Sequence, residues 1–362
     1  MRLILTAICT ILLSANNAYS QEPAEFVPAD NNFVIASFDP KQAPQHIDEI
    51  LEQQSDDTLG RIAFLLNNAK YVGNSQFYDK ANSLLDTVEA TGAKAAQVMY
   101  YQAIIKQHFH EFDDSLAILD KVIVIDPSNN NARLLKANLL AIKGDFAKAK
   151  QACSSLVGAA EPIVVAACKL NTDAQAGSDE QIEKALAELT KFNERFPSSS
   201  PETASYIAEI QASMAVYIKQ YSQANDILTP FTHTKQTVSF WVLYSDVHLA
   251  LGEPNKVLST LSSIVDLSET KDDALLLRLA MAEKMRNVNP AKWDEQIRQR
   301  VKLRILRQDE EHAFDIALYY MHIEKQMDKA YEWAKINWQQ AKLQEDSALL
   351  SKAKQLAMDE SQ

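Results

Sequence analysis

The stretch ANLLAIKGDFAKAKQACSSL, from Ala137 to Leu156, decides the fold of this chain. Its apolar residues recur at helical spacing on both sides of Gly144-Asp145, which predicts two amphipathic helices joined by a short turn. Glycine adopts the left-handed backbone conformation that ends a helix, and aspartate accepts hydrogen bonds from the free N–H groups that begin one. The stretch is therefore expected to form a helical hairpin.

The same pattern recurs along the chain with an offset of 34 residues, as the small residues Ala69, Ala103 and Ala137 show. Small residues at a helix crossing allow two helix axes to approach closely. A proline cannot continue a helix, so Asp126-Pro127 is expected to separate one hairpin from the next. Four further position classes keep the same offset: Tyr78, Phe112 and Phe146; Ala81, Ser115 and Ala149; Leu85, Leu119 and Cys153; Val88, Val122 and Leu156.

The stretches ARLLKANLLAIKGDFAKAKQACSSL and VMYYQAIIKQHFHEFDDSLAILDKVIVIDP resemble the tetratricopeptide repeat, a helix-turn-helix unit of 34 residues. About six units resemble it between residues 62 and 345. The helix around CKLNTDAQAG matches poorly, and residues 272–310 read as a helical pair without the signature. The resemblance implies an all-α, right-handed α-solenoid of antiparallel hairpins over residues 46–345, followed by a capping helix and tail over 346–362.

The N-terminal sequence predicts export. Arg2 precedes an apolar run from Leu3 to Leu13, and the small-residue pattern Ala18-Tyr19-Ser20 follows, as in a secretory signal peptide over residues 1–20. The compartment would be the periplasm if the source is a Gram-negative bacterium. A lipid anchor would need a cysteine just after the apolar run, whereas Cys9 lies within it. The proline-rich residues 21–45 are expected to form an extended arm.

Charge and composition exclude some classes of function. The net charge of -12 argues against a nucleic-acid partner, whose phosphates would meet an acidic surface. With only 7 glycines, the chain has little material for active-site loops, and it contains no nucleophile elbow, phosphate-binding glycine loop, HExxH or paired-cysteine motif. We therefore expect no catalysis and no cofactor.

The groove of such a solenoid is lined mainly by the first helix of each hairpin, and the resemblance implies that protein partners dock there. Family members that clamp a terminal carboxylate need lysine where this chain has Leu66, Tyr100 and Leu134, so that activity is not expected. The expected function is an exported, non-catalytic adaptor that binds a segment of another envelope protein. The alternatives are a cell-wall-acting helical enzyme and a structural spacer. The expected groove residues are Leu66, Lys70, Tyr100, Ile104, Gln107, Leu134, Asn138, Glu209, Ser213, Val242, Asp246 and Tyr319, with Asp315 and His322 beside them.

Histidines and a basic run offer weaker signals. His108 and His110 lie two residues apart at a helix end and point to different sides, no nearby cysteine or carboxylate completes a metal site, and the isolated His312 and His322 give no stronger signal. No metal is expected. The basic run is expected to be a solvated face that pairs with local acids such as Glu310 and Glu311, or alternatively a surface for an anionic partner; its members are Arg298, Arg300, Lys302, Arg304 and Arg307.

Cys153 and Cys168 are the two cysteines that would remain after signal cleavage. They fall on consecutive antiparallel helices at similar height, so a disulfide that closes a loop of about 15 residues is one interpretation. The other is a pair of buried thiols that pack as small apolar residues, because Cys153 occupies the class held by Leu85 and Leu119. The sequence leaves both interpretations open.

Overall fold

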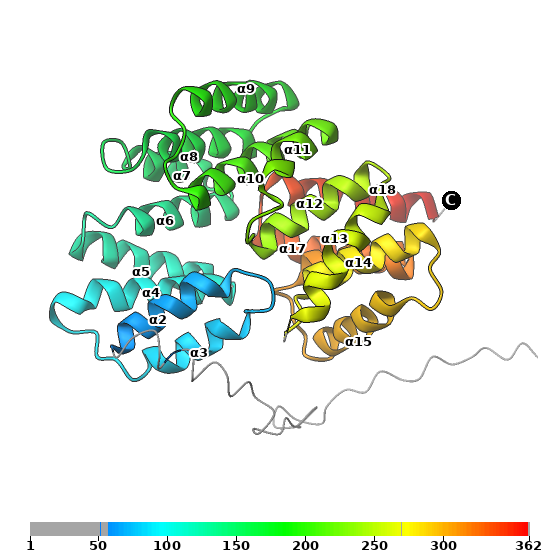
Figure 1. Ribbon diagram of the computed structural model, residues 1–362, viewed down its shortest axis with the longest axis horizontal. Helices are drawn as coiled ribbons and strands as arrows, with labels where there is room; N and C mark the ends of the chain where they lie inside the picture. The colour runs from blue at the N-terminus through cyan, green and yellow to red at the C-terminus, as the bar shows by residue number, and fades with distance from the viewer. Residues whose placement is uncertain (1–50, 52–56, 269, 361–362) are drawn as a thin grey trace, which may run out of the picture. The chain divides into compact units, whose positions relative to one another are not determined.

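The hairpin around Gly144 is present in the computed structural model of the chain, which describes residues 51, 57–268 and 270–360 (Figure 1). The helices α6 (Asn130–Ile142) and α7 (Phe146–Ser154) flank the turn. Gly144 has a φ of 79°, and the Asp145 carboxylate accepts a hydrogen bond of 3.2 Å from the Lys148 N–H. The turn predicted from Gly144-Asp145 is confirmed.

Hairpins of this kind follow one another along the described residues, in which no strand longer than an isolated bridge occurs. The first helices of the hairpins are α2 (Thr58–Ala69), α4 (Ala95–His108), α6, α8 (Pro162–Gln175), α10 (Pro201–Tyr217), α12 (Val238–Ala250), α14 (Asp273–Arg286) and α16 (Ala313–Tyr319). The second helices are α3 (Gln76–Leu85), α5 (Phe112–Ile125), α7, α9 (Asp179–Arg195), α11 (Tyr221–Leu228), α13 (Pro254–Leu267), α15 (Lys292–Leu306) and α17 (Met327–Gln340), and α18 (Gln344–Glu360) ends the array. The all-α solenoid predicted from the sequence is confirmed.

The small residues of the repeat lie at the helix crossings. Ala137 and Ala149 are buried, with exposed fractions of 1% and 0%. In the preceding hairpin Ser115 takes the second-helix position, and its hydroxyl donates a hydrogen bond of 2.7 Å to the carbonyl of Ala103. A side chain larger than these would push the two helices apart, which is why the repeat keeps small residues here.

The helix around CKLNTDAQAG, which matched the repeat poorly, is the regular helix α8. Two of its buried positions carry polar side chains, Thr172 and Gln175, and its other buried positions are apolar. The Thr172 hydroxyl donates to the carbonyl of Cys168 at 2.8 Å, and the Gln175 amide donates to the Tyr217 hydroxyl at 3.0 Å. These partners satisfy the buried polar groups, so the segment stays helical although it lacks the repeat signature.

Residues 272–310 form the helical pair α14 and α15, as expected. Glu283 is buried near the end of α14, where its carboxylate accepts hydrogen bonds from the backbone N–H groups of Trp293 and Asp294 at 2.8 and 3.0 Å. Those N–H groups belong to the first turn of α15 and would otherwise lack partners. Glu283 therefore caps the start of α15, although it lies outside that helix.

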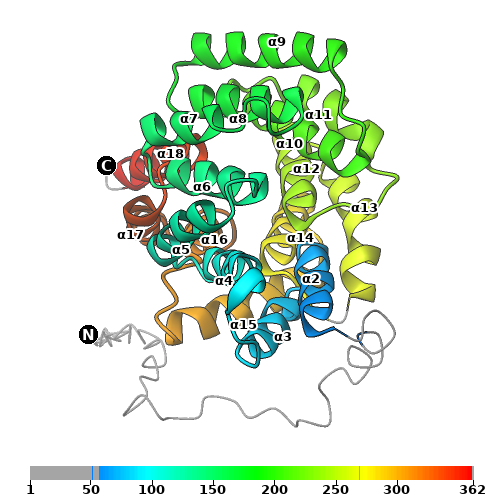
Figure 2. The same ribbon diagram turned by 90° about the vertical axis from the view of Figure 1, so that its left-hand side faces the viewer.

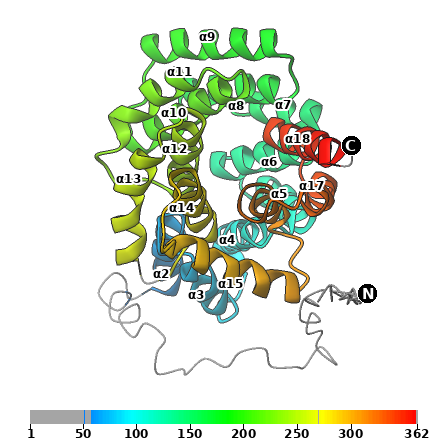
Figure 3. The same cartoon turned by 90° about the vertical axis from the view of Figure 1, so that its right-hand side faces the viewer.

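The first helices line the interior of the array and the second helices lie outside. In Figures 2 and 3, α9, α13 and α15 lie on the outside in both views, and α10, α12 and α14 face inward. One large apolar core runs from Ile163 in α8 to Ala353 in α18, and smaller cores join α2 to α4, α4 to α6 and α6 to α8. Each hairpin thus buries its apolar face on its neighbours, as in repeat proteins.

The array also closes on itself. Turns that follow the first helices of the early hairpins contact loops that precede the first helices of the late hairpins, and we call this line of contacts the seam. At the seam, residues 70–76 meet 235–238 and 270–272, residue 110 meets 312, and residues 142–144 and 174–177 meet 342–344. These contacts differ from the packing of each hairpin on its neighbour, because the residues that meet at the seam lie far apart in the sequence.

Hydrogen bonds hold both ends of the seam. Near the start of the array, the Val238 N–H donates to the carbonyl of Lys70 at 3.0 Å, and Tyr71 forms an antiparallel bridge with Thr237. Near the end, the Lys342 N–H donates to the carbonyl of Ile142 at 2.7 Å. The Gln344 side chain follows with hydrogen bonds to carbonyls at the end of α8, the shortest of them 2.9 Å to Gly177.

The helix α18 covers the last hairpin of the array. The expected signal peptide, residues 1–20, and the expected arm, residues 21–45, lie outside the described residues. Helix α18 packs on α16 and α17 and buries Leu349, Ala353 and Ala357. Among the described helices, none combines the length and the apolar character that a membrane span requires.

The structure places a disulfide between Cys153 in α7 and Cys168 in α8. The two Cα atoms lie 5.6 Å apart, within the range that a disulfide spans. Both residues are buried, with exposed fractions of 0% and 5%. The bridge ties the third hairpin to α8, so it braces the array where the repeat signature is weakest.

Candidate partner-binding cavity

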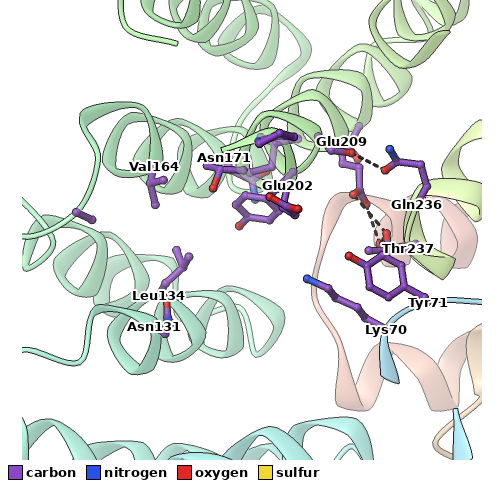
Figure 4. A pocket seen from close by; sticks show the side chains of 18 of the residues that line it. Lys70, Tyr71, Asn131, Leu134, Val164, Asn171, Glu202, Glu209, Gln236 and Thr237 are labelled. Carbon is purple, nitrogen blue, oxygen red and sulfur yellow. Dashed lines mark hydrogen bonds between the residues drawn. The ribbon is translucent and has the colours of Figure 1, made fainter. Parts of the chain in front are cut away.

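The interior of the array contains a cavity of about 1160 Å³, which we call the central cavity. One wall comes from α4, α6 and α8, and the opposite wall comes from α10 and from the seam segments 70–71 and 234–239. Figure 4 shows the Lys70 side chain extending into the open space, with Leu134 and Asn131 on the far wall. The repeat supplies the first wall, and closure of the seam completes the second.

Amide side chains are prominent on the walls. They come from α4, α6, α8 and the seam, so they form a series along the interior. An amide can both donate and accept a hydrogen bond, but Asn130, Gln175 and Gln236 already bond to groups within the protein. Asn171 on α8 and Asn131 on α6 lie on one wall, and Gln236 belongs to the seam (Figure 4). The amides that line the cavity are Gln107, Asn130, Asn131, Asn171, Gln175 and Gln236.

The seam wall also carries charge. The Lys70 and Lys235 ammonium groups lie 5.5 and 4.0 Å from the centre of the Tyr71 ring. Burial, and then the charge of Lys70, lower the pKa of Lys235. Burial raises the pKa of Glu209, whose carboxylate accepts hydrogen bonds from Ser239 at 2.7 Å and Thr237 at 3.4 Å (Figure 4). Two lysines and two glutamates, Glu202 and Glu209, therefore line the cavity on the same wall.

Five of the expected groove residues line the central cavity. Lys70 and Glu209 belong to the charged wall, and the others lie on first helices; the five are Lys70, Gln107, Leu134, Glu209 and Ser213. Tyr100 lies outside it, in a separate hollow of about 550 Å³ that it shares with Tyr101 and Ile125. The sequence register therefore placed part of the lining and not the whole of it.

The remaining groove residues take part in the packing of the array. Leu66 and Tyr319 have exposed fractions of 7% and 6%, which corrects the expectation that they face a partner. Ile104 and Val242 pack against apolar cores, and the Asn138 side chain hydrogen-bonds to Tyr206.

Asp246 and Asp315 form ion pairs with one buried arginine. Arg278 on α14 has an exposed fraction of 2%, and its guanidinium binds Asp246 through two nitrogens at 3.0 and 3.1 Å and Asp315 at 2.6 Å. Burial alone would lower the pKa of Arg278, but the two carboxylates raise it well above its ordinary value. His322 lies nearby, and burial, with the charges of Lys325 and Arg278, lowers its pKa to about 4.

Sequence reasoning missed the seam wall and two asparagines. Tyr71, Lys235 and Gln236 come from turns that only the closure of the array brings to the cavity, so no local pattern points to them. Asn171 lies in the segment that matched the repeat poorly, and Asn131 lies in the first turn of α6, before the usual groove positions. A register fitted to α8 would have identified Asn171.

Three members of the basic run, Arg298, Arg300 and Arg304, pair with acids, although their partners differ from the expected Glu310 and Glu311. The carboxylate of Asp273, in the first turn of α14, accepts hydrogen bonds from the guanidinium groups of Arg300 and Arg304. The distance from Nε of Arg304 to Oδ2 of Asp273 is 2.6 Å. Arg304 also binds Asp309 at 2.5 Å, and Arg298 binds Glu324. These pairs join α15 to neighbouring elements.

A group of possible metal ligands lies outside the central cavity. Within the described part of the chain, Asp309, Glu311 and His312 place one ligand atom each within 4.8 Å of one another. They belong to the loop between α15 and α16, at the seam.

Comparison with known proteins gives only distant structural likeness. No protein-family model and no curated protein matches the chain. Among solved structures, a chain of the APC/C hetero-tetramer Cut9-Hcn1 is similar with 16% identity and a TM-score of 0.48. The match covers 84% of this chain and 64% of that one, so this chain spans less than two thirds of its length.

Two further solved structures carry the same kind of repeat. A tetratricopeptide repeat protein from Parabacteroides merdae shows 12% identity and a TM-score of 0.37, with 78% of this chain and 99% of that chain covered. The P58(IPK) TPR domain shows 10% identity and a TM-score of 0.22, with 88% and 98% covered. Independently of these matches, the hairpins of this chain form an all-α solenoid, and their 34-residue register resembles the tetratricopeptide repeat.

Proposed function

We propose that this protein is a non-catalytic scaffold that binds an extended segment of a protein partner in the central cavity. The observation that carries the proposal is the series of amides along the first-helix wall, of which Asn131 and Asn171 belong to different hairpins. Amides spaced along a wall match the donors and acceptors of an extended peptide backbone, whose own groups need partners once water is removed.

The size of the central cavity favours a polypeptide segment over a small ligand. Pockets for small molecules measure roughly 300–1000 Å³ and are mostly apolar. The central cavity, at about 1160 Å³, is larger and carries amides, tyrosines and both signs of charge. Leu134 and Val164 supply apolar contacts between the polar groups (Figure 4).

We further propose that the protein is exported and that the partner is another envelope protein. The signal-peptide pattern of residues 1–20 motivates this, with Arg2 ahead of the apolar run. The bridge between Cys153 and Cys168 supports it, because disulfides persist in oxidising compartments. Fractionation of producing cells tests the location: the mature protein is expected in the exported fraction with residues 1–20 removed.

Site-specific photo-cross-linking tests the binding site. A photoreactive amino acid at Leu134 is expected to capture a partner protein in producing cells, whereas the same group at Gln223, exposed on the outer helix α11, is expected to capture none. Capture from Gln223 alone would place the partner on the outer face and contradict the proposal.

The amide series predicts a graded loss of affinity for the captured segment. Asn131→Ala and Asn171→Ala each remove one side-chain hydrogen bond, worth about 0.5–1.5 kcal/mol, so the double variant is expected to bind roughly 5- to 150-fold more weakly. Gln223→Ala is the matched control, because it removes an exposed amide outside the cavity. Unchanged affinity of the double variant would refute the role of the amides.

A further inference from the structure

A cluster of histidines and carboxylates spans the seam where the turn after α4 meets the loop before α16. His110 lies in that turn with a φ of 56°, and His312 immediately precedes α16. Their ring centroids lie 5.7 Å apart, with 32° between the ring planes. The two residues are distant in the sequence, so only closure of the array brings them together.

The loop contributes a compact set of ligand atoms. Asp309, Glu311 and His312 place theirs within 4.8 Å of one another. Each oxygen of the Asp309 carboxylate has a different partner. Oδ1 lies 2.8 Å from Nδ1 of His312, and Oδ2 lies 2.5 Å from the Arg304 guanidinium. A carboxylate on Nδ1 keeps the proton there and leaves Nε2 of the same ring free to bind a metal, which is how histidine ligands are usually oriented.

The spacing of the two rings suits a shared ion. With a metal–nitrogen distance of about 2.0–2.1 Å and tetrahedral geometry, two imidazole rings on one zinc have centroids roughly 5–6 Å apart. His110 and His312 already lie within that range. Glu311 is exposed and belongs to the same group of ligand atoms as His312. A hollow of about 750 Å³, lined by His110, Asp309 and Glu311, gives an ion a path from solvent.

We propose that the seam binds one divalent transition-metal ion through His110, Glu311 and His312, with Asp309 as the positioning residue that holds His312. The ion would join two hairpins that are not neighbours in the array, and so would fix the closed arrangement. This inference is independent of the proposed scaffold function, because the cluster lies outside the central cavity.

Zinc binding by the full chain tests the proposal. After removal of metal by a chelator, equilibrium dialysis against Zn²⁺ is expected to give one ion per chain. His110→Gln and His312→Gln are each expected to weaken binding by more than about 100-fold, and Asp309→Asn by about 10- to 100-fold. His233→Gln and His322→Gln are matched controls, because these histidines lie outside the cluster, and both are expected to bind zinc as the parent does.

Hydrogen exchange separates a bridging ion from one held by the loop alone. Zinc is expected to slow exchange at residues 109–112 as well as at 309–313. Circular dichroism of each variant without metal checks that the variant folds. Loss of binding in His312→Gln but not in His110→Gln would overturn the bridge, and binding that neither variant weakens would overturn the site.

Discussion

The buried ion pairs of Arg278 allow a quantitative test of how the late hairpins hold together. The guanidinium is 2% exposed and makes three hydrogen bonds to two carboxylates, on α12 and α16. Arg278→Met keeps the apolar length of the side chain and removes the charge. Asp246 and Asp315 then face one another without a cation, and removal of one partner from a buried pair costs about 3–5 kcal/mol.

For Arg278→Met we expect the lower end of this range of roughly 3–5 kcal/mol for the loss of one partner of a buried ion pair. The Asp246 and Asp315 side chains keep exposed fractions of 36% and 24%, so water partly compensates for the missing cation. We therefore expect Arg278→Met to lower the free energy of unfolding by about 3 kcal/mol. The added substitutions Asp246→Asn and Asp315→Asn should restore much of this loss, because they remove the uncompensated charges.

Equilibrium unfolding in urea, followed by far-ultraviolet circular dichroism, measures the change. Arg286→Met is the control, since Arg286 is exposed at the end of the same helix and should cost less than about 0.5 kcal/mol. A loss below about 1 kcal/mol for Arg278→Met, or a loss equal to that of the control, would refute the reasoning.

Three further predictions concern other parts of the array. Titration of the denatured, unreduced mature protein should find no free thiol, and Cys153→Ala with Cys168→Ala should lower stability by about 3 kcal/mol; two free thiols per chain would exclude the bridge. Gly73 has a φ of 81°, and an added Cβ would lie 2.8 Å from the Cβ of Ser268, so Gly73→Ala should cost about 1–3 kcal/mol in urea unfolding and speed hydrogen exchange at 70–76. Burial of the carboxylate within the array, and then the charge of Asp346, raise the pKa of Glu345 to about 7, but the residue is exposed, so water screens part of this effect. Its contribution to stability is present below the unfolded pKa of about 4.3 and is lost as the pH rises through 7, so Glu345→Gln should unfold at a higher temperature than the parent above pH 7 and at nearly the same temperature near pH 4; equal melting temperatures across that interval would contradict this.

The hairpins could be predicted from the sequence because each rests on local signals. Gly144 ends α6, Asp145 begins α7, and Ala137 and Ala149 mark the crossing, all within one unit. The same signals failed at α8, where Thr172 and Gln175 replace apolar residues and find hydrogen-bond partners that the sequence does not reveal. A repeat signature detects helices whose buried positions are apolar, and it misses a helix whose buried polar side chains are hydrogen-bonded.

The seam could not be predicted, and the reason is physical. In a repeat array each hairpin packs on its neighbours, and the small rotation between neighbours sets the curvature of the whole. Whether the turn at Lys70 reaches the loop at Val238 depends on the sum of those rotations over several hairpins, and no single residue encodes that sum. The seam residues themselves then appear as ordinary turn residues, as Gly73 and Thr270 do.

Closure also explains why the candidate sites lie where they do. The central cavity is bounded by Tyr71 and Lys235 from the seam, and the proposed metal cluster joins His110 to His312 across it. Both sites therefore depend on contacts between hairpins that are distant in the sequence. If the seam opens as a unit, both sites lose contact between their two halves at the same time. Gly73→Ala strains the seam at a distance from His110. A seam that opens as a unit therefore predicts that this variant weakens zinc binding.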